Sequence, residues 1–229
     1  MLNIVGTPIG NLEDLSLRAA KIIASSDIIL AEDTRSAHIL LNFIKSSFML
    51  RVTCSMIWSY YKDVEFQKLP EILELLKDGK NITLISESGM PLISDPGFLS
   101  VKNCIKNNYP ITVIPGPTAI TTALLYSGFE IDQEAGFMFL GFLPKQQSKI
   151  ARCIDTLISL KKIQKKLLFV FYESPKRINQ TLEILSNLLP ASEVCVCREL
   201  TKKFEEVVRG KPADLMKRTY RGEITVILQ

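Results

Sequence analysis

The residues best suited to binding a ligand lie in three short loops rich in glycine, proline and small polar side chains. Glycine leaves backbone N–H and C=O groups accessible, and proline fixes the chain direction, so such loops hold a ligand mainly through the backbone. Each loop follows an apolar run typical of a buried parallel strand. Because the carboxyl ends of parallel strands meet at one edge of a sheet, three such loops predict a single small-molecule cleft. The loops are residues 6–11, 86–97 and 115–119, and the apolar runs are residues 2–5, 82–85 and 111–114.

Several common chemistries lack their sequence motifs. The chain has neither the G-x-x-x-x-G-K-[ST] phosphate loop nor the dinucleotide fingerprint G-x-G-x-x-G after its first strand. It also lacks a G-x-S-x-G nucleophile elbow, and its single histidine, His38, leaves little scope for a Ser-His-Asp triad. Of the functions considered, binding of a small ligand through backbone groups and small residues is the one that the sequence still supports.

Two α/β domains are the fold that best positions these loops. In residues 1–115, strand-like runs alternate with helical patterns, which predicts a parallel sheet flanked by helices. One expected helix is Pro70–Lys77, opened by its proline. Residues 116–229 contain more strands in succession, so a mixed sheet is expected there. We place the boundary near Pro115–Gly116 and the cleft between the two domains.

Composition narrows the class and the compartment. With 47% hydrophobic and 23% charged residues, the 229-residue chain is typical of a folded globular protein. No apolar run approaches the roughly 20 residues of a membrane helix, and the N-terminus lacks a secretory pattern, so we expect a cytoplasmic protein without membrane attachment. Five scattered cysteines favour reduced thiols over a disulfide framework or a metal site.

Charge is distributed unevenly along the chain. Residues 1–115 carry 11 Lys and Arg against 12 Asp and Glu, whereas residues 116–229 carry 17 against 12. A basic second half is able to attract a phosphate backbone. A solvated helix surface is the alternative interpretation, and charge alone slightly favours it.

An ordered series of motifs resembles the ribosomal RNA small subunit methyltransferase I family, which consists of 16S rRNA cytidine 2′-O-methyltransferases. That family belongs to the tetrapyrrole (corrin/porphyrin) methylase superfamily, and the resemblance covers nearly the whole chain. The motifs are Val5-Gly-Thr-Pro-Ile-Gly-Asn-Leu12, Ala31-Glu-Asp-Thr-Arg35, Gly89-Met-Pro-Leu-Ile-Ser-Asp-Pro-Gly97, Ile114-Pro-Gly-Pro117, Gly141-Phe-Leu-Pro-Lys145, Tyr172-Glu-Ser-Pro175 and Arg198-Glu-Leu-Thr-Lys202.

The resemblance implies S-adenosylmethionine as cofactor, no metal, the small-subunit rRNA as partner, and a homodimer. It also implies a cofactor trough between the two domains. By position in the family motifs, the implied cofactor-binding residues are Ile9, Ser88, Gly89, Met90, Ile93, Thr118, Ala119, Tyr172 and Glu173.

Methyl transfer to a ribose oxygen depends on positioning and benefits from a proton acceptor. We expect Asp33 or Glu32 as that acceptor and Arg35 as an orienting group. In the alternative interpretation, Asp33 caps the following helix and pairs with Arg35. Candidate substrate-binding residues are Asn11, Lys145, Lys176 and Arg177, although Asn11 is equally suited to shaping its turn.

The chain departs from the family pattern where substrate is expected to be read. Tyr61-Lys62-Asp63-Val64 replaces a His-x-His-Asn stretch, and the nearby Trp58, Tyr60 and Tyr61 are suited either to base stacking or to packing. Two alternatives to an rRNA methyltransferase therefore stay open. One is a methyltransferase acting on a tetrapyrrole or another small metabolite. The other is a non-catalytic cofactor-binding module of the same fold.

Overall fold

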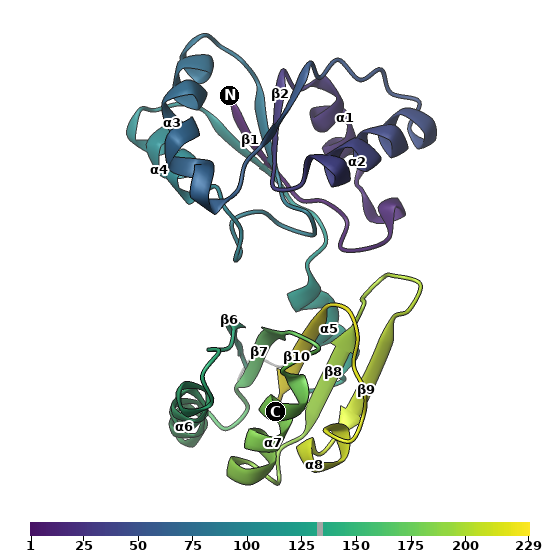
Figure 1. The fold of residues 1–229 in the computed structure, drawn as a ribbon, viewed down its shortest axis with the longest axis vertical. Helices are drawn as coiled ribbons and strands as arrows, with labels where there is room; N and C mark the ends of the chain where they lie inside the picture. The colour runs from purple at the N-terminus through teal and green to yellow at the C-terminus, as the bar shows by residue number, and fades with distance from the viewer. Residues whose placement is uncertain (132–134) are drawn as a thin grey trace. The chain divides into compact units, whose positions relative to one another are not determined.

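The computed structural model describes residues 1–131 and 135–229 and contains two compact units, Met1–Thr118 and Ala119–Gln229. We call them the N-terminal unit and the C-terminal unit and describe each by itself (Figure 1). Each has its own five-stranded sheet. The first sheet is entirely parallel and the second is mixed, as the sequence predicts.

The N-terminal sheet has the strand order β3-β2-β4-β1-β5. Its central strands are buried along their whole length, as expected of a sheet covered on both faces. The elements are β1 (Leu2–Val5), the 3₁₀ turn η1 (Leu12–Asp14), α1 (Leu17–Ser25), β2 (Ile28–Ala31), α2 (Thr34–Ser47), β3 (Met56–Ser59), α3 (Lys62–Lys77), β4 (Ile82–Ile85), α4 (Phe98–Lys106) and β5 (Ile111–Ile114).

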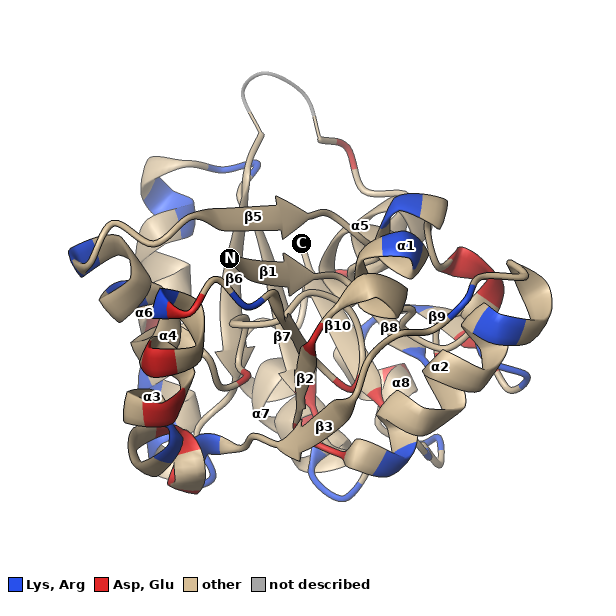
Figure 2. Cartoon of the chain, turned by 90° about the horizontal axis from the view of Figure 1, so that it is seen from above, with Lys and Arg blue, Asp and Glu red and all other residues tan. Residues whose placement is uncertain are grey.

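Helix α3 differs from the sequence prediction. It begins at Lys62 and carries Pro70 in its interior, so the proline does not open it. A proline there removes one backbone hydrogen bond. The helix continues because residues on both sides of the proline are buried: Glu65 before it, and Ile72 and Leu76 after it. Tertiary packing thus outweighs a local helix-breaking signal. The exposed part of α3 carries charges of both signs (Figure 2).

The C-terminal sheet has the strand order β6-β7-β10-β8-β9, in which only β6 and β7 run parallel. Phe169, Phe171, Val196 and Val226 contribute to its fully buried core. The elements are α5 (Ala119–Ser127), β6 (Phe137–Phe142), α6 (Gln147–Ile163), β7 (Leu168–Glu173), α7 (Ile178–Leu188), β8 (Val194–Arg198), β9 (Glu206–Gly210), α8 (Pro212–Leu215) and β10 (Ile224–Leu228).

Candidate active site

Strands β1, β4 and β5 are neighbours in the parallel sheet, so their carboxyl ends bring the three predicted loops to one edge. β1 pairs with β4 on one side, through Val5 and Ile85, and with β5 on the other, through Val5 and Ile114. The Gly6 N–H continues this pairing by donating to the Ile114 carbonyl at 3.0 Å. The predicted meeting of the loops is therefore confirmed.

Glycine allows the backbones of these loops to touch. A Cβ on Gly6 would lie 2.7 Å from the Gly116 Cα and 2.6 Å from the Met90 Sδ, so neither loop has room for a side chain there. Gly89 has a φ of +83°, and its Cβ would lie 3.2 Å from the Ile9 Cγ2. Glycine is thus required at positions 6 and 116 because the two backbones touch, and it is favoured at position 89 by the left-handed backbone and a tight contact.

Hydrogen bonds fix the loops to one another. The Thr7 N–H donates to the Gly89 carbonyl at 2.8 Å, and the Ser86 hydroxyl donates to the same carbonyl at 2.9 Å. The Gly116 N–H approaches the Met90 Sδ at 3.3 Å. These contacts hold Gly89 and Met90 in place relative to the first and third loops.

Among the predicted cofactor residues of this unit, Ile9, Gly89 and Met90 lie inside the packed loops. Ser88 is exposed, and Ile93, within the second loop, is 42% exposed. Thr118 is partly buried and ends the third loop. The loops thus bury some of these residues and leave others exposed.

The second loop contains backbone strain and is held at its far end by a carboxylate. Leu92 and Ser94 have φ values of 74° and 75°, which non-glycine residues seldom adopt. The buried Glu65 of α3 accepts hydrogen bonds from the N–H groups of Gly97 at 3.1 Å and Leu99 at 2.7 Å. Glu65 therefore caps α4 from another helix. Sequence reasoning missed this residue, because no local motif marks a cap supplied by a distant element.

The carboxylates after β2 have different surroundings. Asp33 caps α2 by accepting from the Arg35 N–H at 2.8 Å, and its side chain pairs with the Arg35 guanidinium at 2.7 Å. The Arg35 side-chain and backbone hydrogen bonds lower the pKa of Asp33. Glu32 is exposed. The capping interpretation of Asp33 is thus realised, and its lowered pKa makes it a weak proton acceptor.

Asp95, in the second loop, has a raised pKa, in contrast to Asp33. Burial, reinforced by the nearby charges of Glu32 and Glu87, raises its pKa to about 6. Such a carboxyl group takes up a proton more readily than an ordinary aspartate near neutral pH. Sequence reasoning did not single out Asp95, because its burial depends on the folded loop.

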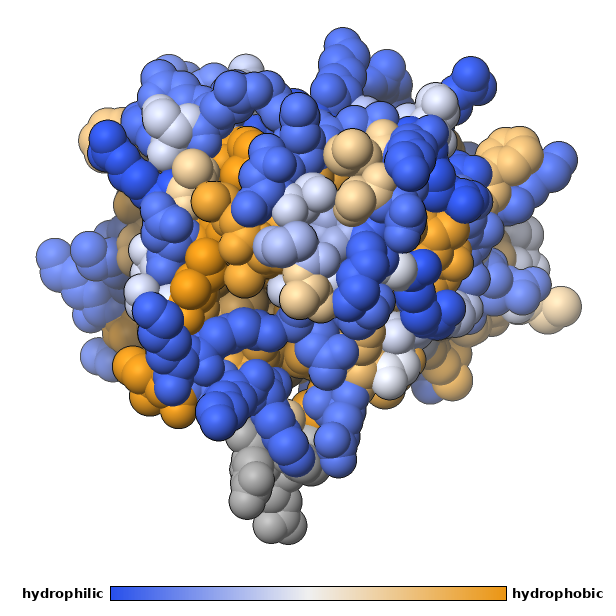
Figure 3. Space-filling view, turned by 90° about the horizontal axis from the view of Figure 1, so that it is seen from below, coloured by the Kyte–Doolittle hydropathy of each residue, from blue (hydrophilic) through white to orange (hydrophobic). Residues whose placement is uncertain are grey.

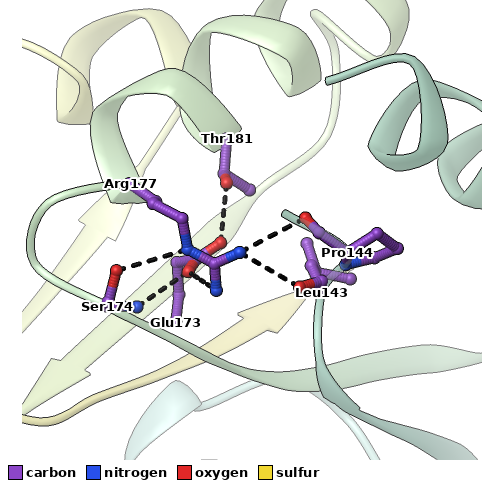
Figure 4. Close-up of polar contacts among 6 residues, drawn as sticks. All are labelled: Leu143, Pro144, Glu173, Ser174, Arg177 and Thr181. Carbon is purple, nitrogen blue, oxygen red and sulfur yellow. Dashed lines mark hydrogen bonds and ion pairs between the residues drawn. The ribbon is translucent and has the colours of Figure 1, made fainter. Parts of the chain in front are cut away.

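In the C-terminal unit, Glu173 and Arg177 form a buried network (Figure 4). The Glu173 side chain is 0% exposed and lies 2.6 Å from the Arg177 guanidinium. Its carboxylate also accepts from the Ser174 N–H at 2.7 Å and the Thr181 hydroxyl at 2.8 Å. Arg177 in turn donates to the carbonyls of residues 143 and 144. Both side chains are therefore engaged in joining β7, α7 and the segment after β6.

Three of the remaining predicted residues of this unit, Tyr172, Lys145 and Lys176, are close in sequence to members of that network. Tyr172 packs against Phe139 and Phe142, with ring centroids 5.0 and 5.4 Å away. Lys145 and Lys176 are exposed, and Ala119 is the first residue of α5. Tyr172, Lys145 and Lys176 thus lie at the edge where β6 and β7 end.

Two of the open alternatives receive a structural answer in the N-terminal unit. Asn11 accepts from the Glu13 N–H at 3.1 Å, so it caps the η1 turn. Tyr60 is fully buried, with its hydroxyl 2.7 Å from that of Ser100, so it is a packing residue. Trp58 is partly exposed, with the Lys68 Nζ 4.5 Å from its ring centroid.

Residues 1–131 and 135–229 contain neither a three-ligand metal cluster nor a membrane-spanning helix. Across these ranges, no three His, Cys, Asp or Glu side chains are arranged to hold a metal ion. Cys195 and Cys197 are both buried, with their sulfur atoms 3.6 Å apart. No helix in the described ranges has the length and apolarity needed to cross a bilayer.

Comparison with known proteins assigns this fold to a class. The family described as Tetrapyrrole (Corrin/Porphyrin) Methylases matches residues 1–216. The methyltransferase CobJ superposes with a TM-score of 0.71 at 16% identity, over 99% of this chain and 92% of CobJ. The Thermus thermophilus uroporphyrin-III C-methyltransferase complexed with S-adenosylhomocysteine gives a TM-score of 0.66 at 14% identity, over 99% and 96%. The fold is that of the tetrapyrrole methylases, a class of methyltransferases.

Two curated relatives narrow the class. The ribosomal RNA small subunit methyltransferase I of Thermotoga maritima is 40% identical, over 99% of this chain and 97% of that protein. The Bacillus subtilis protein of the same name is 36% identical, over 100% of this chain and 75% of its own length. The chain therefore belongs to the ribosomal RNA small subunit methyltransferase I family, and the predicted resemblance is confirmed.

Proposed function

We propose that this methyltransferase uses S-adenosylmethionine to methylate the 2′-hydroxyl of a cytidine ribose in 16S rRNA of the small ribosomal subunit. Identity of 40% to a relative named for small-subunit rRNA, over nearly the full length of both chains, carries the proposal. The loops fit the cofactor: three glycine-containing segments leave backbone groups and small side chains at one edge, where added Cβ atoms would collide.

We propose that the cofactor is held by Ile9, Ser88, Gly89, Met90, Ile93 and Thr118 in the N-terminal unit. The proposal extends to Ala119, Tyr172 and Glu173 of the C-terminal unit. When bound, S-adenosylmethionine supplies an activated methyl group. Because Glu173 is buried and bonded on both carboxylate oxygens, its part in this site is to fix the end of β7 and the adjoining Tyr172.

A ribose hydroxyl is a weak acid, so its attack on a methyl group benefits from a nearby proton acceptor. Glu32 and Asp95 fit this role better than Asp33, whose carboxylate is bound by Arg35. We therefore assign Asp33 and Arg35 to positioning at the start of α2, and proton acceptance to Glu32 or Asp95.

Exposed cations provide the natural contacts for RNA phosphates. Lys145 and Lys176 are exposed at the edge where β6 and β7 end, and we assign them to the substrate. Arg177 positions the segment that leads to Lys145, and Asn11 shapes the first loop. We further propose that the protein is a homodimer, as the family resemblance implies. We also propose that it acts in the cytoplasm, as expected of a protein that modifies ribosomal subunits.

Two measurements test this function. Calorimetry with S-adenosylmethionine should show binding to the wild type and loss of binding in Gly89→Trp, whose side chain would enter the packed loops. Gly79→Trp is the matched control, because Gly79 also has a positive φ of 80° but nothing lies within 4 Å of its Cβ. Cofactor binding unaffected by Gly89→Trp would disprove the placement of the site.

Transfer of a radiolabelled methyl group to 30S subunits lacking the modification tests the acceptor. Labelled 16S rRNA, with the label in a 2′-O-methylcytidine, is expected. Tight cofactor binding with label appearing only on a tetrapyrrole or another small metabolite would support the small-molecule alternative. Binding without transfer to any of these acceptors would indicate a non-catalytic module.

A further inference from the structure

The hairpin tip between β8 and β9, residues 199–205, has an unusual backbone. Glu199 and Thr201 have φ values of 51° and 62°, in the left-handed region. Thr201 is β-branched, and such residues are true outliers at positive φ. Strained conformations persist only where the surroundings enforce them, and they concentrate at functional sites. The backbone of the tip therefore marks it as a candidate functional segment.

Polar contacts enforce this conformation. Glu199 exchanges two hydrogen bonds with Glu223: its N–H donates to the Glu223 carbonyl, and its carboxylate accepts from the Glu223 N–H, both at 2.9 Å. The Lys202 ammonium contacts both carboxylates, at 3.3 and 2.9 Å. The Thr201 N–H donates to the Glu205 carboxylate at 2.6 Å. These contacts tie the tip to Glu223, just before β10, and pair the Glu199 and Lys202 charges, so they restrain the tip.

The restrained tip presents one aromatic ring and one cation to solvent. Phe204 is 65% exposed, and the Lys203 Nζ lies 5.7 Å from its ring centroid. Apolar side chains are exposed elsewhere too (Figure 3), and single ones need no explanation. Phe204 differs because it stands on an enforced backbone beside an exposed lysine that has no carboxylate partner among the described residues.

The tip lies at the same edge of its sheet as the proposed substrate residues. Ile224 of β10 pairs with both Glu173 at the end of β7 and Arg198 at the end of β8. The tip follows Arg198 directly, and Lys176 follows the end of β7. Figure 1 shows the tip and the end of β7 at the same end of this sheet.

We propose that the hairpin tip is an RNA contact, in which Phe204 stacks on an unpaired base and Lys203 pairs with a neighbouring phosphate. This inference rests on the proposed rRNA substrate. An aromatic face beside a cation is the combination that single-stranded RNA binds. A second copy of the chain is a poorer fit, because a stable protein interface needs a broad packed area rather than one projecting ring.

The test measures, by filter binding, the dissociation constant of the complex between the protein and undermethylated 30S subunits. Phe204→Ala should weaken binding about tenfold, while Phe204→Trp keeps it. Lys203→Gln should reduce the slope of log affinity against log salt by about 0.7, which Phe204→Ala leaves unchanged. Ile163→Ala and Lys165→Gln are matched controls, because both residues are exposed. Ile163 is the last residue of α6 and Lys165 lies between α6 and β7, so both precede the start of β7, at the other end of the sheet.

Calorimetry with S-adenosylmethionine should give the same affinity for all these variants, which shows that they are folded. If the wild type binds 30S subunits and Phe204→Ala binds equally well, the tip proposal is wrong while the proposed function stands. If Phe204→Ala instead changes the oligomeric state in light scattering, the tip belongs to a protein interface. If the wild type binds neither 30S subunits nor 16S rRNA, the proposed function fails and the tip proposal with it.

Discussion

Replacement of Arg177 by alanine should strongly destabilise the protein. The substitution leaves the Glu173 carboxylate, with its side chain 0% exposed, without its positive partner 2.6 Å away. Removing one member of a buried ion pair costs roughly 3–5 kcal/mol. Glu173 keeps its hydrogen bonds to the Ser174 N–H and the Thr181 hydroxyl, so we expect the lower end, about 3 kcal/mol.

Urea unfolding followed by circular dichroism at pH 7.5 measures this loss. Arg35→Ala is the matched control, because Arg35 also pairs with a carboxylate, at 2.7 Å, but its side chain is 88% exposed. An exposed pair contributes little to stability because solvent screens its charges, so this variant should unfold close to the wild type. Equal effects of the two substitutions would refute the argument that burial makes the Glu173–Arg177 pair important.

A second variant separates lost charge balance from lost packing. Combining Arg177→Met with Glu173→Gln removes both charges, while the amide oxygen is still able to accept from Thr181. Replacing a buried pair by neutral groups is often tolerated, so the double variant should recover at least half of the loss. Failure to recover would mean that the Arg177 hydrogen bonds to the carbonyls of residues 143 and 144 dominate instead.

Three further predictions follow from the N-terminal unit. Asp95→Asn should stabilise the protein by about 1 kcal/mol at pH 7.5, a value discounted for partial exposure, and by nothing at pH 3.5. The sign follows because the pKa of Asp95 is raised from 3.8 to about 6 in the folded state. The wild type therefore loses stability as the pH rises through that range, and urea unfolding at the two pH values measures the difference. Glu65→Ala should cost about 1–3 kcal/mol in thermal unfolding, because the buried N–H of Gly97 and the partly buried N–H of Leu99 lose their acceptor; an unchanged melting temperature would contradict this. Gly116→Ala should weaken S-adenosylmethionine binding in calorimetry, whereas Gly136→Ala, whose Cβ would meet only ordinary contacts from 3.5 Å outward, should not.

The sheet architecture and the meeting of the three loops are predictable from sequence because their signals are local. Short apolar runs mark the strands, and glycine and proline mark the loops that follow. Gly89 illustrates this: its positive φ is a local need that its residue type announces. The mixed second sheet was expected for the same reason, from strands that follow one another closely.

Other features depend on distant partners and leave no local signal. Strand β3 was not anticipated, because its residues are exposed or partly buried at the sheet edge and its apolar run, residues 56–58, is only three residues long. Pro70 was expected to open a helix that in fact begins at Lys62. Tyr60 and Trp58 look equally suited to stacking in the sequence, yet only the fold shows that Tyr60 is buried.

Carboxylates show this limit most clearly, and they also guide the search for the proton acceptor. A sequence presents every glutamate and aspartate as a candidate base, but the fold uses most of those near the strand ends to hold backbone. Glu65 holds the start of α4, Glu173 the end of β7 and Glu199 the hairpin tip. Among the residues that the structure describes, Glu32 and Asp95 have no such hydrogen bond. A carboxylate already bound to N–H groups is a poor base, because protonation would break those contacts. The two unbonded carboxylates are therefore the ones to mutate first in a search for the acceptor of the ribose proton.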